Sequence, residues 1–329
     1  MRGAIGGGVQ FRRVTIGTAV CAALLAFTAA CGNDVERPRG AVVAVEPTSS
    51  APPAKEVLTL PKRPGSIRFA AIGDAGRGDK RQYEVAAQMA AFHDEFEFRF
   101  VVMLGDNVYD GGTPEDYRQK FELPYKPFLD AGIEFYATIG NHDDPNQPSY
   151  APFHMGGQRY YTFEPDTPLL ADVLRTTVQF FMVDTELVDD TQIAWLDREL
   201  QKSKARWKIP VFHRPIYTSG RYSRPARIFR GLLEPVFVRH SVRVALSGHE
   251  HFYERTEPQH GITYFISGAA GSLRARDARP SPLIARAFDT DYSFMLFEIS
   301  GDELYFQSIS RTGHSVDSGS IKLPDERTH

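Results

Sequence analysis

Five apolar segments in this chain are each followed directly by a short polar motif, and this repeated pattern limits the possible folds more than any other feature. The segments read IRFAAI, FVVML, IEFYATI, IPVF and VRVALS, and their content is typical of buried strands. The polar residues that follow them are Asp74, Asp106 with Tyr109, Asn141 with His142, His213, and His249 with His251. Because ligand sites in open α/β sheets lie just beyond the carboxyl ends of strands, we expect these side chains to share one site.

Helical patterns alternate with the predicted strands. Residues 81–95 (RQYEVAAQMAAFHDE) have apolar residues at helical spacing, and residues 189–203 (DDTQIAWLDRELQKS) combine acids at the start with an apolar stripe. Residues 292–310 indicate a hairpin that turns at Gly301 and Asp302. Together these patterns predict an α/β fold of layered, mixed sheets with some antiparallel edge strands.

The polar motifs offer more metal ligands than one ion needs. A single catalytic transition metal takes three or four ligands from protein, so a larger set favours two adjacent ions with one carboxylate between them. Mixed oxygen and imidazole donors favour Fe, Zn or Mn. Glycine precedes the polar residue in four of the five motifs, where the backbone has to turn close to a ligand. The seven candidate ligands are Asp74, Asp106, Tyr109, Asn141, His213, His249 and His251.

The first 30 residues have the pattern of an export signal. A basic start with Arg2, Arg12 and Arg13 precedes an uncharged stretch, residues 14–30, which runs into Cys31 through FTAAC. This ending resembles the lipobox of bacterial lipoproteins, although Thr28 stands where leucine is usual. We therefore expect an exported protein whose lipidated Cys31 anchors it to the cell envelope. An ordinary cleaved signal and a soluble secreted protein is the alternative, and the choice between general and twin-arginine export stays open.

The remaining sequence predicts a tether, one domain and a short tail. Residues 31–65 are rich in Pro, Ala, Val and Ser without a helical or strand period, which is typical of a flexible tether. One domain is expected over residues 66–323, followed by a tail at 324–329. The only cysteines are Cys21 and Cys31, so neither a disulfide framework nor a cysteine metal site is expected in the domain. A net charge of −3 and a pI near 6.4 indicate no nucleic-acid partner.

The five motifs, in order GDAG, GDNVY, GNHD, FHRP and GHEHFYER, resemble those of the binuclear metallophosphoesterases, the calcineurin-like superfamily. Two details favour the purple acid phosphatase branch, which includes the tartrate-resistant acid phosphatases. The broader family usually has Asp-x-His in the first motif, whereas this chain has Asp74-Ala75-Gly76. Tyr109, three residues after Asp106, is similar to the tyrosinate ligand of the purple enzymes.

The resemblance implies a four-layer α/β/β/α sandwich with a dinuclear metal site. Fe(III) is expected at Asp74, Asp106, Tyr109 and His251, with Asp106 bridging to a second ion. That ion, expected to be Fe(II), Zn or Mn, is implied at Asp106, Asn141, His213 and His249.

The implied reaction is hydrolysis of small phosphate monoesters by a bridging or terminal metal-bound hydroxide. His142 is expected to contact the phosphate or the leaving oxygen, and orientation of Asn141 or Asp106 is its alternative role. Tyr217 and Arg221, in the loop after His213, are candidate substrate contacts. Glu254 and Arg255 are expected to pair with each other.

Two other functions remain open at this point. The same metal core serves phosphodiesterases and nucleotide-cleaving enzymes, and a surface binding protein could keep the fold without catalysis. The natural substrate and the oligomeric state are not indicated by the sequence.

Overall fold

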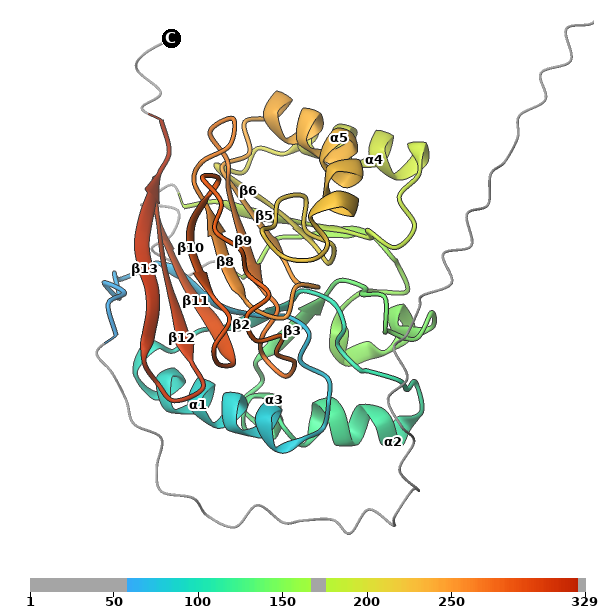
Figure 1. Ribbon diagram of the computed structural model, residues 1–329, viewed down its shortest axis with the longest axis vertical. Helices are drawn as coiled ribbons and strands as arrows, with labels where there is room; N and C mark the ends of the chain where they lie inside the picture. The colour runs from blue at the N-terminus through green and yellow to red at the C-terminus, as the bar shows by residue number, and fades with distance from the viewer. Residues whose placement is uncertain (1–57, 167–175, 325–329) are drawn as a thin grey trace, which may run out of the picture. The chain divides into compact units, whose positions relative to one another are not determined.

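The computed structural model describes residues 58–166 and 176–324. Within these residues two β-sheets lie face to face, and helices cover the outer side of each sheet (Figure 1). This α/β/β/α order of layers confirms the predicted four-layer sandwich of mixed sheets.

The first sheet has six strands. They are β1 (Ile67–Ile72), β2 (Phe100–Met103), β3 (Glu134–Ala137), β11 (Ser293–Ser300), β12 (Glu303–Ser310) and β13 (Ser315–Lys322). Their order across the sheet is β13-β12-β11-β1-β2-β3. β1, β2 and β3 run parallel, and β11 to β13 form an antiparallel meander beside β1. The predicted hairpin at Gly301 and Asp302 is the connection between β11 and β12.

The second sheet has seven strands. They are β4 (Tyr161–Phe163), β5 (Val178–Val183), β6 (Trp207–Phe212), β7 (Val244–Ser247), β8 (Tyr253–Thr256), β9 (Thr263–Ser267) and β10 (Ile284–Phe288). Their order is β10-β8-β9-β7-β6-β5-β4. β5, β6, β7 and β9 are parallel, whereas β4, β8 and β10 pair antiparallel at the two sides. The parallel strands of both sheets therefore bring their carboxyl ends to one edge of the sandwich.

Helices seal both outer faces. The first sheet is covered by α1 (Lys80–Phe96), α2 (Pro114–Tyr117), a π-helix (Arg118–Glu122) and α3 (Lys126–Asp130), and the second by α4 (Asp190–Lys202) and α5 (Ser223–Arg239). Two short 3₁₀ helices occupy Gln147–Ser149 and Ala151–Phe153. The predicted helices at 81–95 and 189–203 are α1 and α4, and each begins after an aspartate, Asp79 or Asp189, whose carboxylate accepts backbone N–H bonds.

The layers enclose three apolar cores, of which the middle one lies between the sheets. There the ring of Phe69 on β1 meets the edge of Phe180 on β5 at a centroid distance of 5.2 Å. The two outer cores join each sheet to its helices. Rigid packing on both faces of each sheet fixes the strand ends where the polar motifs begin.

Two features of the fold differ from expectation. α5 was not predicted, because Pro225 and Pro235 lie within it and proline usually interrupts a helix. Packing against the domain also begins before residue 66, since the side chains of Leu58 and Leu60 are buried in the core under α1. Among the described residues, no helix combines the length and the apolar character needed to cross a membrane.

Candidate metal centre

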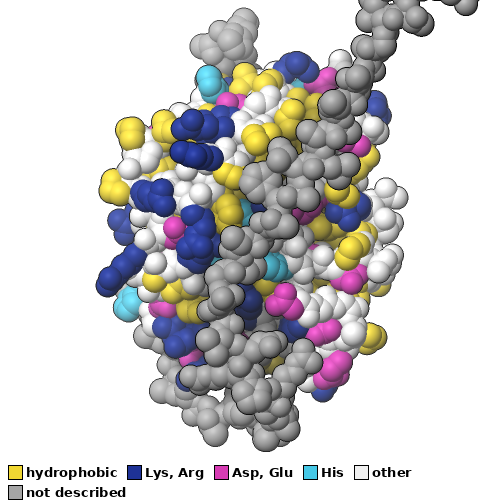
Figure 2. All heavy atoms as spheres, turned by 45° about the vertical axis from the view of Figure 1, so that its right-hand side comes forward, with side chains coloured by type: hydrophobic (Ala, Val, Ile, Leu, Met, Phe, Trp, Pro, Cys, Tyr) yellow, Lys and Arg dark blue, Asp and Glu magenta, His cyan; other side chains and the backbone are white. Residues whose placement is uncertain are grey.

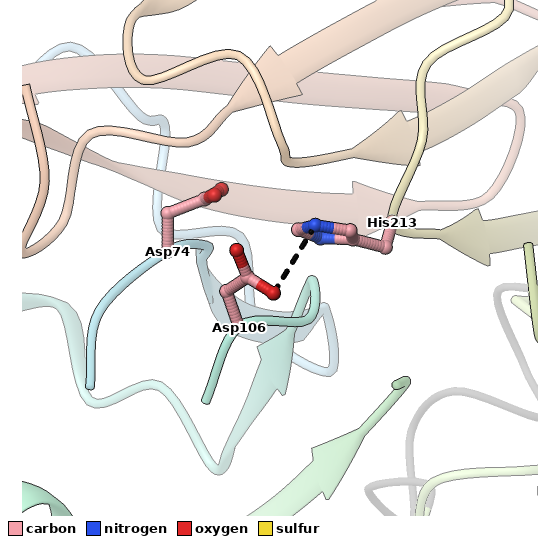
Figure 3. Close-up of side chains that lie close together, drawn as sticks. All are labelled: Asp74, Asp106 and His213. Atoms are coloured by element: carbon pink, nitrogen blue, oxygen red, sulfur yellow. Dashed lines mark ion pairs between the residues drawn. The ribbon is translucent and has the colours of Figure 1, made fainter. Parts of the chain in front are cut away.

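The structure places the polar motifs directly after five parallel strands. Three of their residues, Asp74, Asp106 and His249, have left-handed backbone angles, with φ of 56°, 52° and 69°. Non-glycine residues rarely adopt this conformation, and it occurs preferentially at functional sites. Asp74, Asp106 and His213 point toward one another from three different strand ends (Figure 3). The motifs follow β1 (Asp74), β2 (Asp106, Tyr109), β3 (Asn141, His142), β6 (His213) and β7 (His249, His251).

Three side chains form one compact group, which we call the first donor set. The Tyr109 hydroxyl oxygen lies 3.2 Å from Oδ1 of Asp74 and 3.1 Å from Nε2 of His251. Nε2 of His251 lies 3.2 Å from the same Asp74 oxygen. The other Asp74 oxygen accepts the backbone N–H of His249 at 2.7 Å, which fixes the carboxylate. Asp74 and Tyr109 are buried, and the three donor atoms meet at one point.

A second donor set consists of Asn141, His213 and His249. Nε2 of His213 lies 3.2 Å from Oδ1 of Asn141 and 3.2 Å from Nδ1 of His249. The rings of His213 and His249 meet edge to face, with centroids 4.9 Å apart. These residues come from β3, β6 and β7, so this set, like the first, is assembled from separate strands.

Asp106 connects the two sets. Its Oδ1 lies 3.3 Å from Nε2 of His213 and accepts the backbone N–H of His142 at 2.9 Å. Asp74, Asp106 and His213 each offer a ligand atom, and these three atoms all lie within 4.8 Å of one another. Asp106 therefore has the position that a bridging carboxylate requires.

The donor atoms fit a metal ion on chemical grounds. Nδ1 of His213 donates to the carbonyl oxygen of Leu104 at 2.8 Å, which directs Nε2 toward the centre. Nε2 faces the acceptor oxygens of Asn141 and Asp106, an arrangement that a cation stabilises, either a proton on Nε2 or a metal ion in its place. Separations of 3.1–3.2 Å within each set also suit one ion, because ligands about 2.0–2.2 Å from a metal lie roughly 3 Å apart.

The electrostatics of the centre favour bound positive charge. Burial lowers the pKa of His213, but the Asp106 carboxylate beside it outweighs burial and raises that pKa well above its ordinary value. Burial raises the pKa of Tyr109, and the carboxylates of Asp74 and Asp106 raise it further. Both shifts reflect concentrated negative charge in a buried site, where a cation is strongly attracted.

Asp143 holds two of the strand-end loops together. Its carboxylate accepts backbone N–H bonds from Asn107 at 2.7 Å, Val108 at 2.9 Å and Gly140 at 2.8 Å. The first two donors lie in the loop that carries Asp106 and Tyr109. The sequence indicates a polar loop at residues 141–144, but it does not show which second loop this side chain reaches.

Two glycines allow the loops to approach each other. A Cβ atom on Gly140 would stand 2.2 Å from both the backbone nitrogen and Oδ1 of Asp106, a distance that real Cβ atoms do not reach. Gly105 has φ of 87°, and a Cβ there would lie 2.5 Å from Nδ1 of His213. Close approach of two strand ends therefore accounts for glycine at these positions.

A loop after His213 forms one wall of the centre. The ring of Tyr222 lies over His249 at a centroid distance of 4.2 Å. Buried Glu250 fixes this loop by accepting bonds from the Thr218 hydroxyl at 3.1 Å, the Tyr222 backbone at 3.0 Å and the Arg274 guanidinium at 3.0 Å. Glu250 was not predicted, because its partners are distant in the sequence.

His142 and Arg221, two other predicted site residues, belong to neither donor set. His142 is partly exposed beside the donor atoms, with its ring 4.8 Å from that of Tyr109 and Nδ1 3.7 Å from Oδ1 of Asp110. Arg221 is also exposed, and its Nε donates to Asp277 at 2.9 Å. Cys31 lies outside the described residues.

Tyr217 does not fit the predicted substrate contact. Its side chain is buried in the core beneath α5, and its hydroxyl donates to Glu234 at 2.9 Å. The expected pair of Glu254 and Arg255 is also wrong, because adjacent strand residues point to opposite faces. Glu254 accepts N–H and O–H bonds from Ser219, whereas Arg255 pairs with Asp317 at 2.7 Å.

Comparison with known proteins agrees with this geometry. A family model described as calcineurin-like phosphoesterase matches residues 67–253, a range that includes both donor sets and Asp106. Purple acid phosphatase 17 of Arabidopsis thaliana is 26% identical over 280 residues, which cover 75% of this chain and 82% of that protein. Tartrate-resistant acid phosphatase type 5 of Mus musculus is 25% identical over 291 residues, covering 76% of this chain and 89% of that protein.

Solved structures share the fold. Purple acid phosphatase PPD1 from yellow lupin superposes with a TM-score of 0.64 at 18% identity, covering 80% of this chain and 55% of that one. GAP50, the anchor in the inner membrane complex of Plasmodium, superposes with a TM-score of 0.68 at 19% identity, covering 80% of this chain and 90% of that one. At these identities the likeness concerns the fold alone.

Proposed function

The chain belongs to the calcineurin-like phosphoesterase family, and from that premise we propose that it hydrolyses phosphate monoesters at a centre of two metal ions. The observation that carries the proposal is the convergence of two donor sets on Asp106, with separations of 3.1–3.2 Å within each set and 3.3 Å between Asp106 and His213. Two bound cations would supply a hydroxide nucleophile near neutral pH and neutralise charge on the phosphate.

The residues of the chain have separate roles in this proposal. Asp74, Tyr109 and His251 hold one ion, Asn141, His213 and His249 hold the other, and Asp106 bridges them. His142 is partly exposed at the centre, and its backbone N–H is fixed by Asp106 at 2.9 Å. In this proposal its ring, which is exposed beside the donor atoms, donates a proton to the leaving oxygen of the substrate.

The two donor sets suit different ions. The first set contains a carboxylate and a phenol that can lose its proton, so it favours a hard trivalent ion, and we assign Fe(III) to it. The second set, apart from the shared Asp106, contains only a neutral amide and two imidazoles, which suit Fe(II), Zn or Mn. The similarity to purple acid phosphatases supports this assignment.

Hydrolysis of p-nitrophenyl phosphate and of bis(p-nitrophenyl) phosphate by purified, metal-loaded protein tests the reaction. We expect the monoester to be the better substrate by kcat/KM. Preference for the diester would make the protein a phosphodiesterase, and no hydrolysis of either compound with two ions bound would favour a binding role.

The visible spectrum tests the iron assignment. Iron-loaded protein should show a broad tyrosinate-to-iron band that is absent in Tyr109→Phe. A colourless wild-type protein with two zinc ions after iron-replete expression would contradict Fe(III) while leaving phosphoester hydrolysis intact.

We further propose that Cys31 anchors the domain to the cell envelope. The support for this is the N-terminal pattern of residues 1–31. Metabolic labelling with a fatty acid should label the wild-type protein and not Cys31→Ser.

A further inference from the structure

Two segments next to the metal centre contain a high density of arginine. Residues 219–230 and 272–283 together hold seven arginines and a single acidic residue, Asp277, in a chain whose net charge is −3. We call these two segments the arginine rim. The arginines are Arg221, Arg224, Arg227 and Arg230 in the first segment, and Arg274, Arg276 and Arg279 in the second.

The two segments lie against each other. Nε of Arg221 donates to Oδ2 of Asp277 at 2.9 Å, and the backbone N–H of Arg279 donates to the Ser219 hydroxyl at 3.2 Å. Asp277 also lies 3.4 Å from Nε of Arg274. The single acid of the rim is therefore already shared by two of its arginines.

The rim borders the second donor set. From the first segment, Tyr222 places its ring 4.2 Å from that of His249. From the second, Nη2 of Arg274 donates to the carbonyl oxygen of His249 at 2.6 Å. Arg224 and Arg276 follow these two contact residues by two positions, a backbone step of at most about 7 Å. The Cα atoms of Arg224 and Arg276 therefore lie within about 7 Å of those of two residues that contact His249.

Four of the rim arginines are exposed and have no carboxylate partner among the described residues: Arg224, Arg227, Arg276 and Arg279. Figure 2 shows Lys and Arg side chains gathered on the left of the face that it displays, with most Asp and Glu side chains on the right. The four arginines belong to two segments that contact each other, so their like charges repel one another, and a bound anion would relieve this repulsion.

We propose that the arginine rim binds a second anionic group of a multiply phosphorylated small-molecule substrate while the metal centre holds the phosphate to be cleaved. This inference rests on the proposed phosphomonoesterase function. Phosphate is the favoured group because the planar guanidinium donates paired N–H bonds that match two phosphate oxygens. A substrate with one phosphate has no group left for the rim once that phosphate is at the metal centre.

Paired substrates test the proposal with the full, metal-loaded chain. Fructose 6-phosphate and fructose 1,6-bisphosphate differ by one phosphate, and we expect kcat/KM to be about tenfold higher for the bisphosphate, beyond the factor of about two from its second ester. In R224Q/R276Q the value for the bisphosphate should fall about tenfold and that for the monophosphate much less. Equal losses for both substrates, or no loss, would overturn the proposal.

A matched control distinguishes an effect of the arginine rim on kcat/KM from an effect of the total charge of the protein. R99Q/R243Q removes two arginines that precede β2 and β7, at the strand ends opposite the metal centre, and should leave both kcat/KM values unchanged. If this control lowers the bisphosphate value equally, the preference comes from net charge and the proposal fails. Thermal unfolding of both double variants checks that they are folded.

Direct binding distinguishes failure of this inference from failure of the proposed function. Calorimetric titration with fructose 1,6-bisphosphate should show binding that R224Q/R276Q weakens about tenfold, even if the protein hydrolyses no ester. Hydrolysis without such weakening would leave the phosphatase function standing and refute the rim. Phosphatidylglycerol vesicles provide the last test: binding to vesicles that R224Q/R276Q abolishes, with unchanged sugar phosphate binding, would assign the rim to a lipid surface instead.

Discussion

The two donor sets have the same size and similar spacing but opposite electrostatic character. The first set joins the Asp74 carboxylate to a buried phenol, and the nearby acids raise the pKa of Tyr109 further. The second set has no acid of its own, and Arg214 lies 3.2 Å from Nε2 of His249. Burial, the charge of His213 and that of Arg214 lower the pKa of His249 well below its ordinary value. The same edge of the sandwich therefore offers two sites for a cation, of which the first is strongly anionic and the second is nearly neutral.

Because the two sets differ in this way, the carboxylate between them, that of Asp106, should matter for cation binding at both. Asp106 contacts the second set through His213 at 3.3 Å, and it also has a ligand atom within 4.8 Å of one from Asp74 in the first set. Removing its charge affects both places, whereas removing a member of one set affects mainly that set. The following predictions use this distinction, from the largest expected effect to the smallest.

The largest effect is expected for Asp106→Asn. The amide keeps the shape of the side chain but loses the charge that two cations would share, so kcat should fall by on the order of 10³-fold or more. Steady-state kinetics on p-nitrophenyl phosphate checks this. Activity within tenfold of wild type would show that Asp106 is not the bridge.

Single-set variants should separate the two places. In His251→Ala the ion of the first set should be lost and that of the second retained, and His213→Ala should show the reverse, each with a loss of activity on the order of 100-fold. Elemental analysis after dialysis measures which metal remains. Loss of both ions from each variant would mean that the sets are not independent.

An intermediate effect is expected for Asp143→Ala. This residue touches no donor atom, but its carboxylate holds the backbone of Asn107 and Val108 against the loop of Asn141. Its removal should weaken metal affinity by about 10–100-fold, as for other groups that orient ligands. Asp143→Asn, which keeps one acceptor oxygen, is the matched variant and should lose less. Equal affinity in Asp143→Ala and wild type would refute this role.

The smallest effect is on the pH dependence of stability, and it comes from Glu254, which belongs to neither donor set. Burial raises the pKa of Glu254 to about 7, although bonds from Ser219 oppose the shift. Because this pKa is higher in the folded state, the contribution of Glu254 to stability is fully present below its unfolded pKa near 4.5 and is lost as pH rises through about 7.

Glu254→Gln should remove that dependence. Wild-type protein is expected to lose up to roughly 3 kcal/mol more of its free energy of unfolding than this variant between pH 4.5 and 8. Denaturant unfolding at several pH values provides the measurement. Parallel curves for the two proteins would show that Glu254 does not titrate in this range.

The residues differ in how far the sequence alone could place them. Asp74, Asp106 and His249 follow apolar segments directly, so the rule that sites lie at strand ends locates them. Asp143 and Glu250 also lie in these motifs, but their roles depend on loops that are distant in the chain, such as residues 218–222. Tyr217 shows the same limit of sequence-based prediction. Only the packing of α5 shows that its hydroxyl contacts Glu234.

The helices and strands also differ in how far the sequence alone could predict them. The hairpin at Gly301 and the capped helix α4 have local signals, and both were predicted. α5 has Pro235 inside it, and tertiary packing of Leu233 and Phe237 overrides the local preference against a helix. Strand β8 and the edge strands β10 and β13 were also not predicted, since their short or polar sequences carry little periodic signal.

Metal stoichiometry is the most direct test of the central claim that Asp106 joins two distinct ion sites. Inductively coupled plasma mass spectrometry on dialysed protein should give two ions per wild-type chain and close to none per chain of Asp106→Asn. One ion per wild-type chain under metal-replete conditions, or two ions retained in Asp106→Asn, would contradict the dinuclear account.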